Sequence, residues 1–215
     1  SNAIKRSRVG IRNDKKPIAS FMFIGSTGVG KTQTAKSLAN YYFGGEKNII
    51  RLDMSEYQQL DSLNRLIGNP DGQSIGILTE KIRSNPYTLI LMDEIEKAHE
   101  KVILTFLQVL DDGRLTDNMG TTLDFTNTII IATTNIGTKK IQELSKEGLN
   151  FETIEQQALV EVRNHFAPEF LNRFTDLIVF HTLSIDNLKQ ITKIELKKVE
   201  EILNQKGIKV LFKPE

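Results

Sequence analysis

Short apolar runs, separated by turn residues and amphipathic segments, are the main pattern along this chain. Residues 21–24, 88–92 and 128–134 are mostly apolar, which is typical of strands buried on both faces of a parallel sheet. Residues 48–53 alternate between apolar and polar positions, and residues 177–180 form one more short apolar run. Because helical patterns lie between these runs, the sequence predicts an α/β fold.

Apolar residues at helical spacing mark the segments between the predicted strands. Ala35, Leu38, Ala39 and Tyr42 recur at i, i+3, i+4 and i+7, which predicts a helix that begins near Lys31. Further helices are expected over residues 78–83, 98–110, 139–146, 154–166 and 186–205.

Three more elements concern turns and the end of the chain. Ser55 is expected to cap a helix, and residues 123–125 and 208–212 are expected to be further strands. Because the last of these strands begins just as the chain stops, we expect one large domain over residues 4–182 and the beginning of a small, truncated domain over residues 183–215. Residues 1–3, Ser-Asn-Ala, are typical of a cloning scar and are excluded from the fold.

The segment from Gly25 to Thr32 fits the phosphate-loop pattern G-x-x-x-x-G-K-[ST] without a gap. It follows a predicted strand and opens a predicted helix, as this motif requires. Its glycines let backbone N–H groups approach phosphate oxygens, and the helix N-terminus adds partial positive charge. Lys31 is expected to reach the β/γ-phosphates and Thr32 to hold Mg²⁺. The alternative, a glycine-rich turn that only caps a helix, fits the full motif less well.

The nucleotide-binding residues predicted from this loop are Gly25, Ser26, Thr27, Gly28, Val29, Gly30, Lys31, Thr32 and Gln33. Their ligand would be a nucleoside triphosphate with its magnesium ion.

Polar residues end two of the predicted central strands. Asp93 and Glu94 follow residues 88–92 directly. In phosphate-loop ATPases the first carboxylate helps to hold Mg²⁺ and the second orients the attacking water. The alternative is an acidic turn before the next helix, and the phosphate loop upstream favours the catalytic pair. Asn135 ends the strand over residues 128–134, where its amide either contacts the γ-phosphate or the water or simply ends the strand; the residues alone leave both open.

Composition narrows the classes of partner and compartment. The 215 residues include no cysteine and carry a formal net charge of +1. The lack of cysteine excludes a disulfide framework and a thiolate metal site and suits a reducing compartment, so a cytoplasmic location is expected. The near-neutral charge gives no broad footprint for nucleic acid, and no apolar stretch is long enough to span a membrane. A basic run between Lys5 and Lys16 is expected to be a solvated surface.

Taken together, these motifs resemble the Clp-family AAA+ ATPases, most closely the C-terminal ATPase module of the ClpB, ClpA and ClpC type. The resemblance runs from about Ile4 to Glu215. It rests on the phosphate loop and on residues 6–8 (RSR), 53–56 (DMSE), 93–99 (DEIEKAH), 107–117 (LQVLDDGRLTD) and 168–173 (PEFLNR).

The resemblance implies a P-loop AAA+ domain with a parallel five-stranded sheet between helices, followed by a small α/β lid domain. It implies that ATP and Mg²⁺ are bound and that ATP is hydrolysed to ADP and phosphate. It assigns Lys31 to the phosphates, Thr32 and Asp93 to the metal, Glu94 to water activation and Asn135 to sensing the γ-phosphate. It also makes Arg173 an arginine finger that acts on a neighbouring subunit. On the residues alone, a surface ion pair is the favoured interpretation of Arg173.

The function implied by the resemblance is that of an unfoldase or disaggregase chaperone that uses ATP to remodel protein substrates. We expect a hexameric ring for the full-length form and a monomer for this chain alone. The alternative is a regulatory or assembly partner that binds ATP without threading substrate, because residues 69–77 lack the aromatic residue that the family uses to grip polypeptide. Glu147-Gly148-Leu149 has a charge where peptidase-docking members have an apolar residue, so docking to a ClpP-like peptidase is not supported. No nucleic acid or membrane partner is expected.

Overall fold

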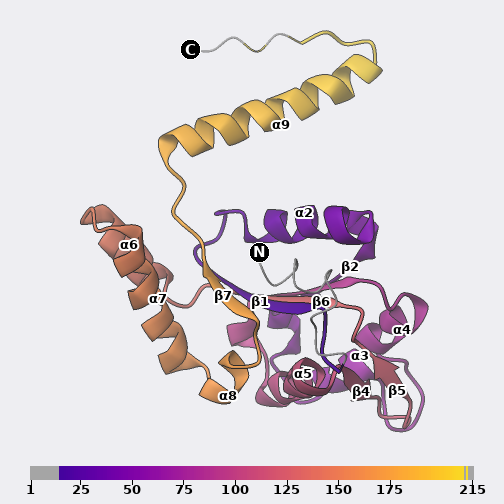
Figure 1. Cartoon of the computed structure of the whole chain (residues 1–215). Helices are drawn as coiled ribbons and strands as arrows, with labels where there is room; N and C mark the ends of the chain where they lie inside the picture. Colours follow the sequence, from indigo (N-terminus) through magenta and orange to yellow (C-terminus); the bar gives the residue numbers. More distant parts are fainter. Residues whose placement is uncertain (1–14, 211, 213–215) are drawn as a thin grey trace. The chain divides into compact units, whose positions relative to one another are not determined.

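The computed structural model describes residues 15–210 and 212 and divides the chain into two units between His181 and Thr182. The first unit contains a central sheet with its helices, and the second contains one long helix (Figure 1). The cloning scar, the RSR segment and the part of the basic run before Lys15 lie outside the described residues.

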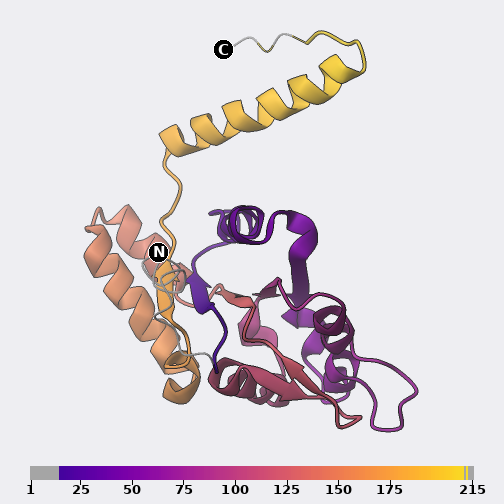
Figure 2. The same cartoon turned by 45° about the vertical axis from the view of Figure 1, so that its right-hand side comes forward.

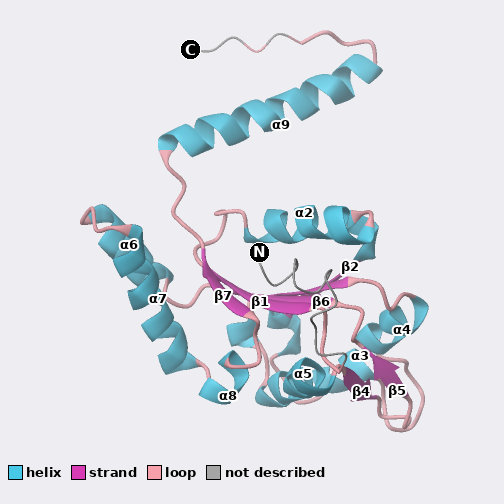
Figure 3. Cartoon of the chain, in the orientation of Figure 1, coloured by secondary structure: helices cyan, strands magenta, loops and turns pink. Residues whose placement is uncertain are grey.

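Five parallel strands form the sheet at the centre of the first unit (Figure 3). They are β1 (Ala19–Ile24), β2 (Ile49–Asp53), β3 (Leu89–Asp93), β6 (Ile129–Thr134) and β7 (Asp176–Val179). Their order is β2-β3-β6-β1-β7. The register pairs Ile24 with Thr134 and Asp53 with Asp93, so the carboxyl ends of four strands meet along one edge. The predicted α/β fold with a parallel five-stranded sheet is confirmed.

Helices cover both faces of this sheet (Figure 1). Helix α2 (Lys31–Phe43) lies on one face, where its Ala35 and Ala39 pack against Phe21, Leu91 and Ile131. The next residues along these strands, Met22, Met92 and Ala132, belong to the larger core on the opposite face, which also contains Phe106. The helices on that side are α3 (Ser62–Ile67), α4 (Ile77–Ser84) and α5 (Glu100–Asp112). This alternation explains why the central strands are apolar on both faces along most of their length.

The remaining elements of the first unit are shorter or lie beside the sheet. Three further helices are α6 (Thr138–Lys146), α7 (Phe151–His165) and α8 (Pro168–Leu171), and three single turns of 3₁₀-helix are η1 (Glu46–Asn48), η2 (Met54–Tyr57) and η3 (Ile95–Lys97). The helix expected over residues 98–110 begins instead at Glu100, because the His99 ring nitrogen accepts a hydrogen bond from the Lys101 N–H and caps it.

The structure corrects one local prediction, the helix cap, and places one predicted strand outside the main sheet. Asp53, and not Ser55, is the cap, since its carboxylate accepts hydrogen bonds from the N–H and the hydroxyl of Ser55 at 2.9 and 2.6 Å. The strand expected at residues 123–125 is β5 (Thr122–Asp124), which pairs only with β4 (Arg114–Thr116) in a separate antiparallel sheet of two strands.

The loop between α3 and α4 extends away from the sheet (Figure 2). It contains the segment without an aromatic residue, and Ile75 in this loop is 53% exposed. The base of the loop is fixed, because the Asn118 side-chain amide donates a hydrogen bond to the Gly68 carbonyl at 2.5 Å. The loop therefore offers one exposed aliphatic side chain, Ile75, at its surface and is attached at its base through Asn118.

The second unit consists mainly of helix α9 (Ile185–Gln205). Ser184 and Asn187 form a capping box at its start. No residue of α9 is buried, and most of its apolar side chains are exposed. A strand was expected over residues 208–212, of which the structure describes 208–210 and 212. This prediction is wrong for the described residues, because none of them pairs with a strand. Across the described part of the chain, no helix combines the length and the apolar character needed to cross a bilayer.

Candidate nucleotide-binding site

A cavity of about 330 Å³ lies at the carboxyl edge of the sheet, beside the N-terminus of α2. Cavities of this size hold small ligands in many proteins. Its walls are formed by Thr27, Gly28, Gly30, Lys31, Thr32, Gln33, Arg51, Asp53, Asp93, Glu94, Thr133 and Asn135. The structure thus brings together most of the residues predicted from the phosphate loop and the two strand ends. Gly25, Ser26 and Val29 do not line the cavity, although the carbonyls of Gly25 and Ser26 accept hydrogen bonds from Lys31.

The backbone of the phosphate loop has the conformation that an anion cradle needs. Gly28 and Gly30 have φ angles of +85° and +101°, where residues with a Cβ are strained. Gly30 is the N-cap of α2, and among the residues that the structure describes no side chain caps the first N–H groups of this helix. These N–H groups and the helix dipole therefore favour a negatively charged ligand at this end of the cavity.

Lys31 is a buried cation that faces the cavity. Its side chain donates hydrogen bonds to the Gly25 carbonyl, to the Ser26 carbonyl at 3.0 Å and to Oδ1 of Asn135 at 3.0 Å. Burial lowers the pKa of Lys31, and the nearby carboxylates of Glu96, Asp93 and Glu94 oppose this shift. All three of its hydrogen-bond acceptors are neutral, so a phosphate in the cavity would be a stronger partner for this amine.

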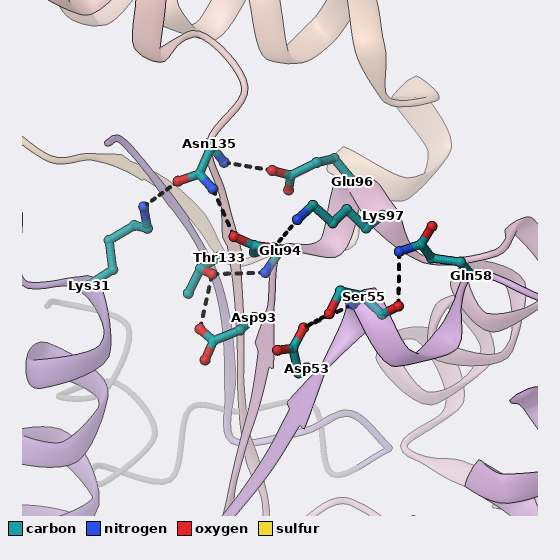
Figure 4. Close-up of polar contacts among 10 residues, drawn as sticks. All are labelled: Lys31, Asp53, Ser55, Gln58, Asp93, Glu94, Glu96, Lys97, Thr133 and Asn135. Atoms are coloured by element: carbon teal, nitrogen blue, oxygen red, sulfur yellow. Dashed lines mark hydrogen bonds and ion pairs between the residues drawn. The ribbon is translucent and has the colours of Figure 1, made fainter. Parts of the chain in front are cut away.

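Asp93 ends β3 and has partners on both carboxylate oxygens (Figure 4 draws the contact with Thr133). Oδ2 accepts a hydrogen bond from Nε of Arg51 at 2.7 Å, and Oδ1 accepts one from the Thr133 hydroxyl at 3.1 Å. Neither Arg51 nor Thr133 was among the predicted site residues. The alternation of residues 48–53 carried a signal, because it places Arg51 and Asp53 on the same face of one strand.

Glu94 has an unusual backbone conformation. Among residues 15–210 and 212 it is the only non-glycine residue with a positive φ angle, +57°. Its carboxylate lies 2.5 Å from Nζ of Lys97 and accepts a hydrogen bond from the Asn135 amide at 3.3 Å (Figure 4). The bond to Glu94 raises the pKa of Lys97. Strained residues of this kind concentrate at functional sites, which is consistent with a specific placement of this carboxylate.

Asn135 connects the two sides of the cavity (Figure 4). Its side chain accepts a hydrogen bond from Lys31 and donates one to Glu94, and its backbone N–H donates to Oε1 of Glu96 at 3.1 Å. The other Glu96 oxygen is buried and has no hydrogen-bond partner among the described residues. The amide of Asn135 therefore lies between the phosphate-loop lysine and the second acid, and its contact with the γ-phosphate or the water stays a prediction.

The residues present suit a magnesium ion that is held mainly by a nucleotide. Thr32 and Asp93 both line the cavity and offer oxygen atoms, the ligand type that Mg²⁺ prefers. No group of three or more His, Cys, Asp or Glu side chains arranged for a metal occurs in the described part of the chain. Mg²⁺ commonly takes one or two protein ligands together with phosphates and water, and Thr32 and Asp93 are the residues that would supply them.

Arg173 does not line this cavity. Its Nε lies 2.6 Å from Oδ2 of Asp111, and Lys16 approaches the other oxygen of Asp111 at 3.3 Å. The contact between Arg173 and Asp111 is an ion pair but not a hydrogen bond. The Nε atom of Arg173 is buried and has no hydrogen-bond partner among the described residues. The ion pair expected from the residues alone is therefore present, and action on a neighbouring subunit stays a prediction.

The fold and the cavity define a phosphate-loop protein of the AAA class. Residues 16–177 match the family described as AAA domain (Cdc48 subfamily), so the chain belongs to this family.

Curated relatives and solved structures agree with this assignment. The chain is 46% identical over 212 residues to Chaperone protein ClpB 1 of Synechocystis sp., covering 97% of this chain and 24% of that protein. It is 46% identical over 222 residues to the ATP-dependent Clp protease ATP-binding subunit ClpC of Staphylococcus aureus, with coverage of 98% and 27%. It thus spans about a quarter of the length of these relatives.

Two solved structures of Hsp104 have the same fold. The S. cerevisiae Hsp104–ADP complex is 39% identical with a TM-score of 0.83, and a reconstruction of Hsp104 with ATPγS and FITC-casein is 40% identical with a TM-score of 0.84. Each match covers 93% of this chain and 35% of the Hsp104 chain.

Proposed function

We propose that the chain is the ATP-hydrolysing module of a Clp-type protein unfoldase or disaggregase. The observation that carries this proposal is the convergence of Lys31, Thr32, Asp93, Glu94 and Asn135 on one cavity. The relatives support the choice of machine, because ClpB is named a chaperone and one Hsp104 structure contains a nucleotide analogue together with casein.

The phosphate loop binds the triphosphate of ATP in this proposal. The N–H groups at the start of α2 and the amine of Lys31 supply the positive charge. Thr32 and Asp93 would hold Mg²⁺, which when bound supplies charge that stabilises the phosphate oxygens during transfer. On nucleotide binding, Lys31 exchanges its neutral acceptors for phosphate, which releases Oδ1 of Asn135.

Hydrolysis then depends on Glu94 and Asn135. The Glu94 carboxylate accepts a proton from the attacking water, and the released Asn135 amide orients that water or contacts the γ-phosphate. Lys97 holds Oε2 of Glu94 through its ion pair, and Oε1 accepts the hydrogen bond from the Asn135 amide, so the carboxylate is held from two sides.

Completion of the site requires a second copy of the chain. Arg173 lies outside its own cavity and would place its guanidinium on the γ-phosphate bound by a neighbour in a ring, which we propose is a hexamer. We further propose protein substrates and a cytoplasmic location. We do not propose docking to a ClpP-like peptidase, because Glu147 places a charge where peptidase-docking members have an apolar residue.

The test uses the full-length protein that contains this chain. We expect Mg²⁺-dependent ATP hydrolysis and ATP-driven unfolding of a tagged fluorescent protein, with Glu94→Gln as the inactive control. ATP hydrolysis without unfolding would instead favour the alternative, a partner that binds ATP but does not thread substrate. Lack of ATP binding would contradict both functions, because both use the same cavity.

A further inference from the structure

The hydroxyl of Thr133 contacts both acidic residues of the site (Figure 4). It donates a hydrogen bond to Oδ1 of Asp93 at 3.1 Å and accepts one from the backbone N–H of Glu94 at 3.2 Å. Thr133 is 3% exposed, so water does not compete freely for either bond. A single buried oxygen therefore connects the carboxylate assigned to the metal with the backbone of the residue assigned to the water.

Strand register explains why Thr133 can make both contacts. β3 and β6 are parallel neighbours in which Met92 is opposite Ala132, so Asp93 and Thr133 are the next residues on adjacent strands. Side chains alternate along a strand, and these two follow Leu91 and Ile131, which pack against α2. Asp93 and Thr133 therefore lie on the face of the sheet that carries the phosphate-loop helix.

The contact with the Glu94 N–H comes at the point where the chain leaves the sheet. Glu94 has a φ of +57°, a conformation that side chains with a Cβ adopt at a cost. Its N–H points to Thr133 and so has a partner in this conformation. Loss of that acceptor would leave the N–H unsatisfied and would favour a different backbone angle at Glu94.

We propose that Thr133 is a positioning residue for both carboxylates, so that one hydroxyl sets the orientation of Asp93 and the backbone of Glu94 together. This inference rests on the proposed hydrolysis of ATP. Thr133 acts through these two residues and does not itself take part in proton transfer. Its removal should therefore disturb Mg²⁺ use and turnover jointly, whereas loss of either acid alone would affect one step first.

The neighbouring residue provides a matched control. Thr134 is fully buried on the same strand and faces the opposite side, where its hydroxyl accepts a hydrogen bond from the Ile136 N–H. Thr133→Val and Thr134→Val remove the same hydroxyl with the same change of shape. Thr133→Ser keeps the hydroxyl and removes only a methyl group.

The experiment measures two quantities in the full-length protein for each variant. The first is the Mg²⁺ concentration that gives half-maximal binding of a fluorescent ATP analogue. The second is the pair of steady-state constants for ATP hydrolysis, kcat and KM, determined separately. For Thr133→Val we expect the required Mg²⁺ concentration to rise and kcat to fall by roughly tenfold or more, as for loss of a hydrogen bond to a charged group, with a smaller change in KM. Thr133→Ser should stay within about threefold of the parent for both quantities.

Several outcomes would overturn the inference. If Thr133→Val matched Thr134→Val in both measurements while the parent bound and hydrolysed ATP, Thr133 would have no positioning role, and the proposed function would stand. If only kcat fell, or only Mg²⁺ use changed, joint positioning would be wrong. Thermal unfolding checks each variant, and Thr133→Ala replaces Thr133→Val if the valine variant does not fold. If the parent itself failed to bind ATP, the proposed function would fail first.

Discussion

The nucleotide cavity and the surroundings of Arg173 are organised in different ways. In the cavity, hydrogen bonds run from the buried Lys31 through Asn135 to Glu94, and the last two residues are partly buried. Arg173 has instead a partly exposed ion pair with Asp111, a residue that Lys16 also contacts. The first region joins a cation to an acid through a neutral amide, whereas the second brings the charges of Arg173 and Asp111 directly together at 2.6 Å. In the function proposed above, the cavity binds nucleotide within one chain, and Arg173 exchanges Asp111 for the γ-phosphate that another copy holds.

The largest expected effect comes from Arg173→Ala in the full-length assembly. Turnover should fall by about 10³–10⁵, the usual contribution of an arginine finger, while nucleotide affinity of the separate chain stays unchanged. Steady-state ATPase assays and nucleotide titrations measure the two quantities. Asp111→Ala is the matched control, because it removes the same ion pair and leaves the guanidinium in place. Equal losses in both variants would mean that Arg173 matters only through its ion pair.

Glu94→Gln should have the next largest effect, on the cavity side of the comparison. We expect turnover to fall by about 10²–10⁴ because the general base is lost, with ATP binding retained. The variant keeps the side-chain shape and an oxygen that can accept from Asn135. Single-turnover hydrolysis and calorimetric binding of ATP test this expectation. Parent-like hydrolysis would show that the water is activated by another group.

Arg51→Met should have a smaller effect than these two substitutions, and it should favour Mg²⁺ binding where they impair turnover. Arg51 places a positive charge 2.7 Å from Asp93, so it competes with any cation for that carboxylate. Its side chain is 62% exposed, which weakens the pair through solvent screening. We expect the Mg²⁺ requirement for nucleotide binding to fall by about threefold or less. A rise would mean that Arg51 helps to orient Asp93 and does not compete with the metal.

The smallest expected effect concerns Asp53 at the rim of the cavity. The Ser55 hydroxyl and N–H lower the pKa of Asp53 below 3.8. A lowered folded-state pKa stabilises the fold above the unfolded value and loses this contribution as the pH falls through the folded value. Ser55→Ala should therefore raise the pKa of Asp53. It should lower the free energy of unfolding by less than about 0.5 kcal/mol at neutral pH, because the Asp53–Ser55 contact is exposed. NMR titration and urea unfolding at pH 3 and pH 7 measure both changes, and an unaltered Asp53 titration would contradict the assignment.

Patterns along the chain predicted the sheet because each central strand is apolar on both faces. They also located Lys31, Asp93, Glu94 and Asn135, since parallel strands end at one edge and bring distant residues together. A local sequence pattern could not predict that Leu123 pairs outside the main sheet, because β5 is three residues long and depends on an equally short partner strand. Residues 208–212 look like a strand locally, but pairing requires a neighbour.

The contacts inside the site were less accessible to prediction than its residues. Thr133 lies within an apolar run, and its role follows only from the register between β3 and β6. The partners of Asp93 and Glu94, which are Arg51 and Lys97, depend on side-chain directions at strand ends and in a single helical turn. A sequence motif identifies chemical groups, whereas their mutual orientation is set by tertiary packing.

The backbone at position 94 affects how mutagenesis there should be designed. Asparagine and glycine tolerate its dihedral angles better than β-branched residues do, so a valine substitution would combine lost chemistry with a distorted turn. A series of glutamine, asparagine and glycine separates the two contributions, since these residues differ in reach and in conformational preference while none can serve as a base. Kinetic comparisons that ignore this preference would credit the carboxylate with losses that belong to the polypeptide path.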